Sequence, residues 1–486
     1  MAENVKTSIK RDQKKVLDAL AEVVGDQFNE DSVERGGTKI KLPSRMTYKR
    51  AAMHLMELDE AEETYTTYVR DFRYRPWDVA AAVDRAIKRV SGTSGIARGE
   101  QSFFGTTPPA RITIQTDVDT FIEVPWGTID VPLFEGTVRV GGRIDDNYGQ
   151  IGVVQCEAKK RYRASIQGLF EVIEDELQVR SIYRGKAITG GINPEFVDLA
   201  TVNPDHVVYS QEVLAQLETS VFSGLRYPEA MRENEVPEKR SVLLTGQYGT
   251  GKTLALMLIG QEAVANGVTF ILVRPGKDDP FECMKTAQLY APAVVAIEDV
   301  DTFSGTTTDR NVMSELLDAF DGIQAKGKPI LNVVTTNHPE KITKGMLRPG
   351  RLDALIEVGP LDLPAVTKLV TVLANGTLDQ DVDFEQVFEK MDGYLPAFIA
   401  ESMARAKRAS IVRGEGELLP LTTADIITGA MSLRPQFEMM HRADEHADEP
   451  TLDGVVRTIV SQGVEQASAP DWDVELEHET GRVVDA

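Results

Sequence analysis

A glycine-rich loop in the middle of the chain has the composition of a phosphate-binding turn. In SVLLTGQYGTGKTLALMLIG, Gly246 is followed after four residues by Gly251, Lys252 and Thr253. Glycines let backbone N–H groups turn toward phosphate oxygens, the lysine reaches the β- and γ-oxygens, and the threonine hydroxyl can bind Mg²⁺. A helix predicted after the loop adds its N-terminal dipole. We expect contacts to a nucleotide from Gly246, Gln247, Tyr248, Gly249, Thr250, Gly251, Lys252, Thr253 and Leu254.

An acidic pair, Glu298 and Asp299, ends the apolar stretch of VVAIEDVD further along the chain. In a phosphate site, one carboxylate can hold the water shell of Mg²⁺ and another can polarise the attacking water. Asn337 ends the stretch ILNVVTTN, where a side-chain amide can orient that water. In MLRPGRLD, Arg348 and Arg351 could stabilise the charge on a transferred phosphoryl group. Together these groups predict Mg²⁺-dependent phosphoryl-transfer chemistry.

Alternating elements between about residues 201 and 360 can position these groups. Five short apolar stretches, SVLLTG, VTFILV, AVVAIED, ILNVVTT and ALIEVG, are separated by helical patterns. Strands that alternate with helices favour a parallel, doubly wound sheet. Residues 361–440 predict helices only. We therefore expect an α/β subdomain that carries the phosphate loop, followed by a helical lid subdomain.

The first 200 residues predict a different architecture. Residues 1–105 read as helical, with apolar residues at helical spacing in QKKVLDALAEVVGDQF and WDVAAAVDRAIKRV. Residues 106–200 predict a β-rich domain, because ARITIQTDVDTFIEVPWGTIDVPLFEGTVRVGGRI is rich in Thr, Val, Ile and aromatic residues between Gly, Pro and Asp breaks. A helix is predicted for RASIQGLFEVIEDELQVRSIY, and a linker for TGGINPE (Thr189–Glu195).

The composition favours a cytoplasmic protein with several domains. The 486 residues suggest about three domains, and 42% hydrophobic and 27% charged residues are typical of globular proteins. Cys156 and Cys283 lie far apart and predict reduced thiols. The N-terminus MAENVKTSIKRDQKK lacks the apolar core of a secretory signal, and no apolar run reaches the ~18 residues of a membrane span.

The charge of the chain disfavours a protein that coats nucleic acid. The formal net charge is -23, whereas binding to phosphate backbones needs a basic surface. Residues 441–486 hold 12 Asp and Glu against three Arg, a net charge of -9. Such a segment is expected to be an acidic, disordered tail. The six histidines are scattered, so no metal site beyond Mg²⁺ is predicted.

Over about residues 205–435, these motifs resemble the AAA family of ATPases. The resemblance rests on GQYGTGKT, VVAIEDVD, LLDAFDG and VVTTNHPEKITKGMLRPGRLD, followed by a helical lid. The motif sequences are most similar to those of the subfamily of the mitochondrial AAA ATPase that translocates folded Rieske iron–sulphur protein. That subfamily also has an inverted acidic pair. Most ring-forming relatives have Asp then Glu at the two positions held here by Glu298 and Asp299.

The resemblance implies a role for each predicted site residue. Glu298 would act with Thr253 on the Mg²⁺ side, and Asp299 would activate water. Asn337 would be the sensor 1 residue. Arg348 and Arg351 would be arginine fingers that act on ATP bound to the neighbouring subunit. That role implies a homo-oligomeric ring of six or seven subunits.

Three departures from the family separate this chain from typical members. Gln247 and Tyr248 stand where prolines are common, which leaves the required glycines in place. No transmembrane helix is predicted, so the membrane-translocation role of the mitochondrial subfamily does not carry over. The segment Val273–Ala293 has no aromatic–apolar–Gly tripeptide, so threading of unfolded polypeptide is not predicted, and Phe281 is expected to be a core residue at a helix start.

The leading hypothesis is a ring-forming, Mg²⁺-dependent ATPase that remodels or translocates a macromolecular client. The client is expected to be a protein, held in a chaperone-like way by the first 200 residues, with no membrane partner. A nucleic-acid loader or translocase is the second hypothesis and is not favoured by the net charge. A third is a nucleotide-gated scaffold that hydrolyses poorly because Asp299 is one methylene shorter than Glu.

Overall fold

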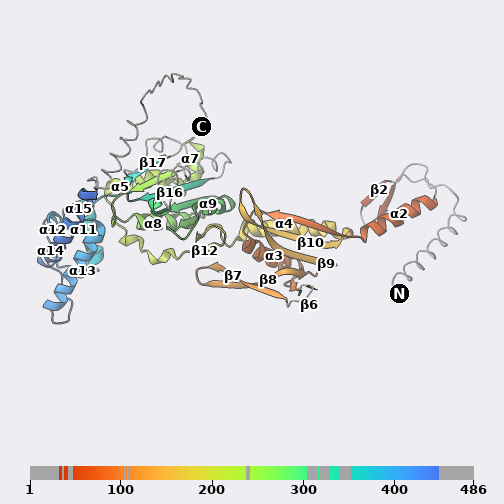
Figure 1. Ribbon diagram of the computed structural model, residues 1–486, viewed down its shortest axis with the longest axis horizontal. Coiled ribbons are helices and arrows are strands. Elements are labelled where there is room, and N and C mark those ends of the chain that lie inside the picture. Colours follow the sequence, from red (N-terminus) through yellow and green to blue (C-terminus); the bar gives the residue numbers. More distant parts are fainter. Residues whose placement is uncertain are drawn as a thin grey trace, which may run out of the picture. The chain divides into compact units, whose positions relative to one another are not determined.

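The computed structural model divides into two compact units, Met1–Gly359 and Pro360–Ala486 (Figure 1). The residues it describes are 32–35, 38–41, 48–99, 101–102, 105–106, 109–236, 241–303, 316, 329–339 and 352–447. The helix predicted for QKKVLDALAEVVGDQF and nearly all of the acidic tail lie outside these ranges.

An antiparallel sheet with two helices on one face begins the first unit (Figure 1). Its order is β3-β10-β9-β8-β4, and β7 pairs with the first part of β8. The strands are β3 (Tyr65–Phe72), β4 (Ile96–Ala97), β7 (Ala110–Asp117), β8 (Thr120–Asp130), β9 (Gly136–Asp145) and β10 (Gly149–Lys159). The helices are α3 (Pro76–Ser91) and α4 (Arg163–Arg180). Other elements are β1 (Ser32–Arg35), β2 (Thr38–Lys41), α2 (Tyr48–Glu62), β5 (Gln101–Ser102) and β6 (Gly105–Thr106).

Helix α3 packs closely on this sheet because its buried side is small and apolar. Residues 79–83 are all buried, and three of them are alanine. Gly152 of β10 permits the contact, since a Cβ at this position would lie 2.3 Å from Val79 Cγ2. The helix ends at Gly92, whose left-handed backbone (φ 76°) lets its N–H bond to the Lys88 carbonyl oxygen at 2.8 Å. The predicted helix in WDVAAAVDRAIKRV is therefore confirmed.

The prediction that residues 1–105 are helical is wrong for five strands, β1 to β5, of which β3 is the longest. Its sequence YTTYVRDF is rich in β-branched and aromatic residues, and its exposure alternates along the strand. It forms one edge of the sheet and pairs with β10, with Val69 opposite Gln155. That partner lies far along the chain, so local patterning could not place it. The strands and the helix predicted within residues 106–200 are confirmed as β7, β8, β9 and α4.

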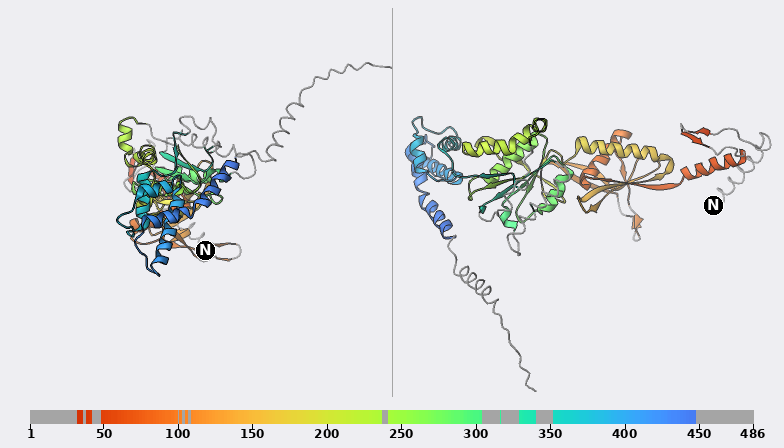
Figure 2. Two further views of the ribbon diagram at one scale, coloured as in Figure 1. Left: turned by 90° about the vertical axis from the view of Figure 1, so that its left-hand side faces the viewer. Right: turned by 90° about the horizontal axis from the view of Figure 1, so that it is seen from above.

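A second, mostly parallel sheet follows in the same unit (Figure 2). Its order is β12-β11-β14-β15-β16-β13-β17, and only the β11–β12 pair is antiparallel. The strands are β11 (Ala187–Thr189), β12 (Glu195–Phe196), β13 (Ser241–Thr245), β14 (Thr269–Val273), β15 (Ala293–Ile297), β16 (Ile330–Thr336) and β17 (Ala354–Glu357). The helices are α5 (Gln211–Leu217), α6 (Ser223–Arg226), α7 (Pro228–Glu233), α8 (Lys252–Ala265) and α9 (Pro280–Leu289). Every residue of β13, β14 and β15 is buried, as in sheets covered on both faces. The predicted α/β fold is confirmed.

The predicted linker Thr189–Glu195 is instead the turn of a hairpin, and its two end residues belong to strands of this second sheet. Strand β11 pairs with β14, with Ile188 opposite Ile271, and the chain turns back so that β12 pairs with β11. The two strands are too short to show a period in the sequence, and Gly and Pro between them resemble a linker. The chain therefore enters the parallel sheet directly after α4.

A buried arginine joins the two sheets of the first unit. The Arg75 side chain donates to the carbonyl oxygens of Tyr148 (3.3 Å) and Gln150 (2.7 Å), and to Thr286 Oγ1 of α9 (2.6 Å). Its backbone N–H donates to the Tyr290 hydroxyl oxygen at 2.9 Å. Arg75 has no exposed surface, and burial lowers its pKa. Because a guanidinium buried without partners is strongly unfavourable, these bonds tie the N-terminal sheet to α9.

The second unit is helical, as predicted. Its helices are α11 (Leu363–Ala374), α12 (Phe384–Lys390), α13 (Pro396–Arg413), α14 (Thr423–Met431) and α15 (Arg434–Ala447). Thr422 begins α14 with a reciprocal capping box to Asp425. Gly429 allows α14 to approach α13, because a Cβ there would lie 2.4 Å from the Ser402 carbonyl oxygen. Within the described part of the chain, no helix is both long and apolar enough to span a membrane.

Candidate active site

The glycine-rich loop connects β13 to α8 and has the backbone that phosphate loops require. Gly246 (φ 152°) and Gly251 (φ 97°) adopt conformations that side chains disfavour. A Cβ on Gly246 would lie 2.2 Å from the carbonyl oxygen of Val358, the residue after β17. Glycine is therefore needed at the start of the loop for packing as well as for its backbone angle.

Lys252 turns its ammonium group into the loop. Its Nζ donates to the carbonyl oxygens of Gly246 (2.7 Å) and Gln247 (2.9 Å), and the residue is only 5% exposed. Burial lowers the pKa of Lys252, and the carboxylates of Asp299 and Asp301 act in the opposite direction. The ammonium group thus lies between the loop and the acidic residues at the strand ends, where it can bind phosphate oxygens.

Thr253 and Glu298 meet at the start of α8. Thr253 Oγ1 donates to Glu298 Oε1 at 2.5 Å, and Glu298 directly follows β15. Both groups are oxygen donors, which suit Mg²⁺. Among the described residues, no group of three or more His, Cys, Asp or Glu could hold a metal by itself. This donor set fits an ion whose remaining ligands are water and phosphate, as is usual for Mg²⁺.

Asp299 and Asn337 are brought together from adjacent strands. Asn337, which follows β16, donates from Nδ2 to Asp299 Oδ1 at 3.0 Å. The backbone N–H of Asp299 donates to Thr335 Oγ1 at 2.9 Å. Asp299 has a left-handed backbone, with φ of 42°. Such a conformation in a non-glycine residue persists only where its surroundings hold it, and it is frequent at functional sites.

The remaining loop residues differ in exposure. Thr250 is 1% exposed, and its hydroxyl donates to the Gln247 carbonyl oxygen at 3.0 Å, which closes the loop on itself. Tyr248 is 62% exposed and Leu254 is 40% exposed. Gly249 has a left-handed backbone with φ of 86°. The loop thus buries Thr250 on its inner side, while Gln247 and Tyr248 of the loop and Leu254 of α8 lie at the surface.

Three other predicted positions remain: Arg348, Arg351 and Phe281. Arg348 and Arg351 lie outside the described residues. Phe281 does begin α9, where its N–H donates to Asp279 Oδ1 at 2.9 Å, but it is 37% exposed. The prediction that Phe281 is a core residue is therefore wrong: the first turn of α9 directs this side chain away from the sheet core.

Sequence reasoning missed two groups beside the site. The Tyr209 hydroxyl donates to the Gly251 carbonyl oxygen at 2.7 Å, and burial raises the pKa of Tyr209. Asp301 Oδ1 accepts a hydrogen bond from Thr336 Oγ1 at 2.8 Å. Tyr209 lies upstream of β13 and belongs to no motif. Asp301 is visible in VVAIEDVD, but nothing in the sequence indicates its partner.

Comparison with known proteins agrees with this geometry. Residues 242–360 match the AAA family model, described as the ATPase family associated with various cellular activities. The first unit therefore contains an AAA ATPase domain. It covers the phosphate loop, the acidic pair, Asn337 and the RPGR segment.

Several curated archaeal proteins are similar to part of this chain. Protein SAV of Sulfolobus acidocaldarius is 31% identical over 236 residues, which is 44% of this chain and 30% of that protein. The cell division cycle protein 48 homolog of Archaeoglobus fulgidus is 29% identical over 219 residues, 42% of this chain and 30% of that protein. Proteasome-activating nucleotidase 2 of Haloferax volcanii is 27% identical over 297 residues, 57% of this chain and 68% of that protein. The chain spans about a third of the length of the first relatives it matches.

Proposed function

We propose that this protein is a Mg²⁺-dependent ATPase that assembles as a ring in the cytoplasm and remodels a protein client. The observation that carries the proposal is the meeting of three pairs at one end of the parallel sheet: Lys252 with the loop, Thr253 with Glu298, and Asp299 with Asn337. The AAA family match over residues 242–360 supports ATP as the nucleotide.

Each residue has one part in the proposed reaction. Lys252 binds phosphate oxygens, while Thr253 and Glu298 hold Mg²⁺ and its water shell. When bound, Mg²⁺ neutralises charge that develops on the phosphoryl oxygens. Asp299 accepts a proton from the attacking water. Asn337 orients that water and, through its hydrogen bond, the Asp299 carboxylate.

The inverted acidic pair fits an active ATPase better than a nucleotide-gated scaffold. Asp299 is one methylene shorter than Glu, but its left-handed backbone and its bonds to Thr335 and Asn337 hold the carboxylate in one place. A residue retained only as a scaffold would not need such a strained position. We therefore interpret the inverted pair as a subfamily variant. The motif sequences that this chain shares with the Rieske-translocating subfamily support that interpretation.

The ring and the client are proposed from the family match and the charge of the chain. The relatives include a cell division cycle protein 48 homolog and a proteasome-activating nucleotidase. We propose that the N-terminal sheet binds the client, because Arg75 ties this sheet directly to α9 of the ATPase domain. A net charge of -23 favours a protein over nucleic acid.

The test is phosphate release by the purified full chain with ATP and Mg²⁺. We expect turnover in the wild type and none in Lys252→Ala, whose loop loses its phosphate-binding cation. Equal turnover in both would contradict the assignment of the loop, and a wild type without turnover under assembled conditions would favour the scaffold. Turnover that rises steeply with added DNA at low salt would instead support the nucleic-acid hypothesis.

A mixing experiment tests the shared site. Arg351→Ala should bind ATP without hydrolysing it, and so should Asp299→Asn. If Arg351 acts on the ATP of a neighbouring subunit, mixed rings of the two variants regain some activity at interfaces that pair one intact Arg351 with one intact Asp299. No recovery in rings confirmed as mixed would count against action between subunits.

A further inference from the structure

We infer that Asp301 is a positioning residue for Asn337, and that it acts through the hydroxyl group of Thr336. The inference rests on the proposed function and concerns the same site. Asp301 follows the acidic pair in VVAIEDVD but lies in a different contact network from Glu298.

The Thr336 hydroxyl is the centre of this arrangement. Its Oγ1 donates to Asp301 Oδ1 at 2.8 Å and accepts from the backbone N–H of His338 at 3.0 Å. A hydroxyl has one hydrogen, so donation to the carboxylate turns a lone pair toward His338. The bond from His338 closes a tight turn over one intervening residue, and that residue is Asn337.

Burial makes this arrangement specific. Thr336 is 2% exposed, and the Asp301 side chain is 6% exposed. In such surroundings an unpaired hydroxyl or carboxylate oxygen carries a desolvation penalty, so the two groups hold each other in one orientation. The second Asp301 oxygen, Oδ2, lies 3.9 Å from His338 Nε2. Asp301 thus contacts the residues on both sides of Asn337.

Asp301 is itself fixed relative to Asp299. The two lie at the start of a 3₁₀ turn, Val300–Phe303, that follows β15. Within it, Thr302 donates to the Asp299 carbonyl oxygen from its backbone N–H (2.9 Å) and from its hydroxyl (2.7 Å). Two of the three carboxylates after β15 therefore act on Asn337: Asp299 bonds to its side chain, and Asp301 bonds to the hydroxyl group that closes the turn around it.

Loss of Asp301 should therefore affect turnover more than nucleotide binding. Asp301 makes no hydrogen bond to the phosphate loop among the contacts of the described residues, whereas it accepts a hydrogen bond from Thr336 and lies 3.9 Å from the His338 imidazole, on either side of Asn337. A misplacement of about 1 Å in a positioning group can lower a rate by about 100-fold. Asp301→Asn keeps an oxygen that can accept the Thr336 bond but removes the charge, so it separates a positioning role from an electrostatic one.

The experiment compares Asp301→Ala, Asp301→Asn and Thr336→Val in the full chain. We measure kcat and KM for ATP, and affinity for a fluorescent ATP analogue. We expect Asp301→Ala and Thr336→Val each to lower kcat about 10- to 100-fold, with KM and analogue affinity within about threefold. Asp301→Asn should stay within about threefold of the wild-type kcat, and the Ala–Val double variant should be no worse than the poorer single variant.

Other outcomes overturn the inference. An Asp301→Asn variant as impaired as Asp301→Ala would indicate that the charge matters rather than the hydrogen bond. Additive losses in the double variant would show that the two groups act independently. If wild-type turnover is present and no variant changes kcat, the inference fails while the proposed function stands. If the wild type has no turnover, both fail.

Two further variants keep the test decisive if Asp301→Ala does not fold. Thr336→Ser retains the hydroxyl and should keep most of the activity that Thr336→Val loses. Thr269→Val is the matched control, because Thr269 is a fully buried threonine at the opposite end of the same sheet, whose Oγ1 donates to the Tyr290 carbonyl oxygen at 2.7 Å. Thr269→Val should reduce stability without changing kcat. If it lowers kcat as much as Thr336→Val does, the effect of Thr336→Val reflects general destabilisation and not a positioning role.

Discussion

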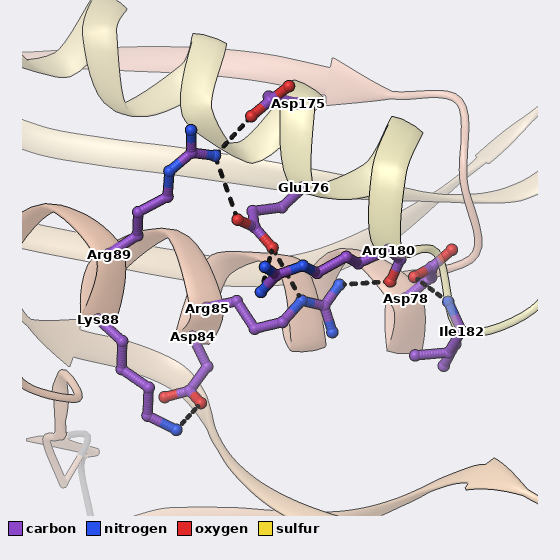
Figure 3. A network of polar contacts seen from close by, with 9 residues as sticks. All are labelled: Asp78, Asp84, Arg85, Lys88, Arg89, Asp175, Glu176, Arg180 and Ile182. Carbon is purple, nitrogen blue, oxygen red and sulfur yellow. Dashed lines mark hydrogen bonds and ion pairs between the residues drawn. The ribbon is translucent and has the colours of Figure 1, made fainter.

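Two clusters of carboxylates in the first unit are held in opposite ways. Between α3 and α4, Glu176 is only 4% exposed and lies within reach of three arginines (Figure 3). Its oxygens are 3.3 Å from Arg85 Nε, 3.3 Å from Arg89 Nη1 and 3.9 Å from Arg180 Nη1. A carboxylate so fully neutralised can hold two helices together, but it has little capacity left for a further cation.

The three carboxylates that follow β15, Glu298, Asp299 and Asp301, are hydrogen-bonded to neutral groups instead. Among the described residues, Glu298 accepts from the Thr253 hydroxyl, Asp299 from the Asn337 amide, and Asp301 from the Thr336 hydroxyl. Hydroxyl and amide donors fix the position of a carboxylate without neutralising its charge. The Lys252 ammonium group acts on Asp299 and Asp301 electrostatically, while its hydrogen bonds go to the loop carbonyl oxygens. The comparison indicates that Glu176, surrounded by arginines, has less charge available to a metal ion or a reacting water than these three carboxylates have.

The largest effect on turnover is expected at Asp299, the carboxylate proposed to accept the proton from water. Asp299→Asn should lower kcat by about 1000-fold, because an amide cannot accept the proton from water. Affinity for an ATP analogue should be retained, and the melting temperature should not fall, since a negative charge is removed from an acidic cluster. Phosphate release and thermal unfolding measure the two effects. A large loss of stability would indicate that Asp299, like Glu176, has a structural role.

Glu176→Ala should show the opposite behaviour. Removal of the carboxylate leaves Arg85, Arg89 and Arg180 facing one another without a counter-charge, and we expect a loss of roughly 3 kcal/mol of unfolding free energy. Denaturant unfolding measures the loss, and ATP-analogue affinity at a temperature where the variant is folded should be unchanged. Glu171→Ala, an exposed carboxylate on the same helix, is the matched control and should change stability little. Equal effects in both variants would refute the structural role of Glu176.

Asp78 provides a third case, a buried carboxylate held by neutral donors but without a catalytic partner. It accepts from Ser181 Oγ (2.6 Å) and from the Ile182 N–H (3.0 Å), and burial raises its pKa to about 6 from an ordinary 3.8. The protonated form is therefore favoured in the folded state. The stability it contributes is fully present below pH 3.8 and is lost as pH rises through 6, by roughly 3 kcal/mol in total, about half of it between pH 5 and 7.5.

Asp78→Asn should remove this part of the pH dependence. The amide keeps one oxygen acceptor and carries no charge, so the variant should gain stability relative to the wild type as pH rises from about 5 to about 7.5. Thermal unfolding across that range measures the change, and Asp146→Asn, at an exposed position, is the control. Parallel curves for wild type and Asp78→Asn would contradict the burial argument.

The smallest effect on stability is expected for the exposed ion pair between α3 and α4. Arg89 Nη1 lies 2.5 Å from Asp175 Oδ2, but both side chains are about half exposed. Water and salt screen such pairs, so Asp175→Asn should shift the melting temperature by less than about 1 °C. A shift as large as that of Glu176→Ala would show that exposure does not separate these two carboxylates.

Prediction from the sequence succeeded where the information is local. The phosphate loop, the apolar strands of the parallel sheet, and helices α3 and α4 each depend on residues close together in the chain, and all these elements are present. Prediction failed for β3, which was expected to be helical, and for the β11–β12 hairpin, which was expected to be a linker. Strand β3 has a strand-like residue pattern, but its partner β10 is distant in the sequence. Strands β11 and β12 have only three and two residues, too few to show a period.

The sequence by itself determined the chemistry that this protein has available: a lysine and a threonine after a glycine loop, an acidic pair after a buried strand, and an amide after the next. Their spacing predicted that they would lie close together, because the acidic pair and the amide follow parallel strands that end at the same edge, and the lysine and threonine begin the helix after the loop. Only the tertiary structure decided which partner each carboxylate has. Asp301 and Glu176 are both acidic residues in ordinary patterns, and Thr336 holds one while three arginines surround the other, because folding brings distant elements together.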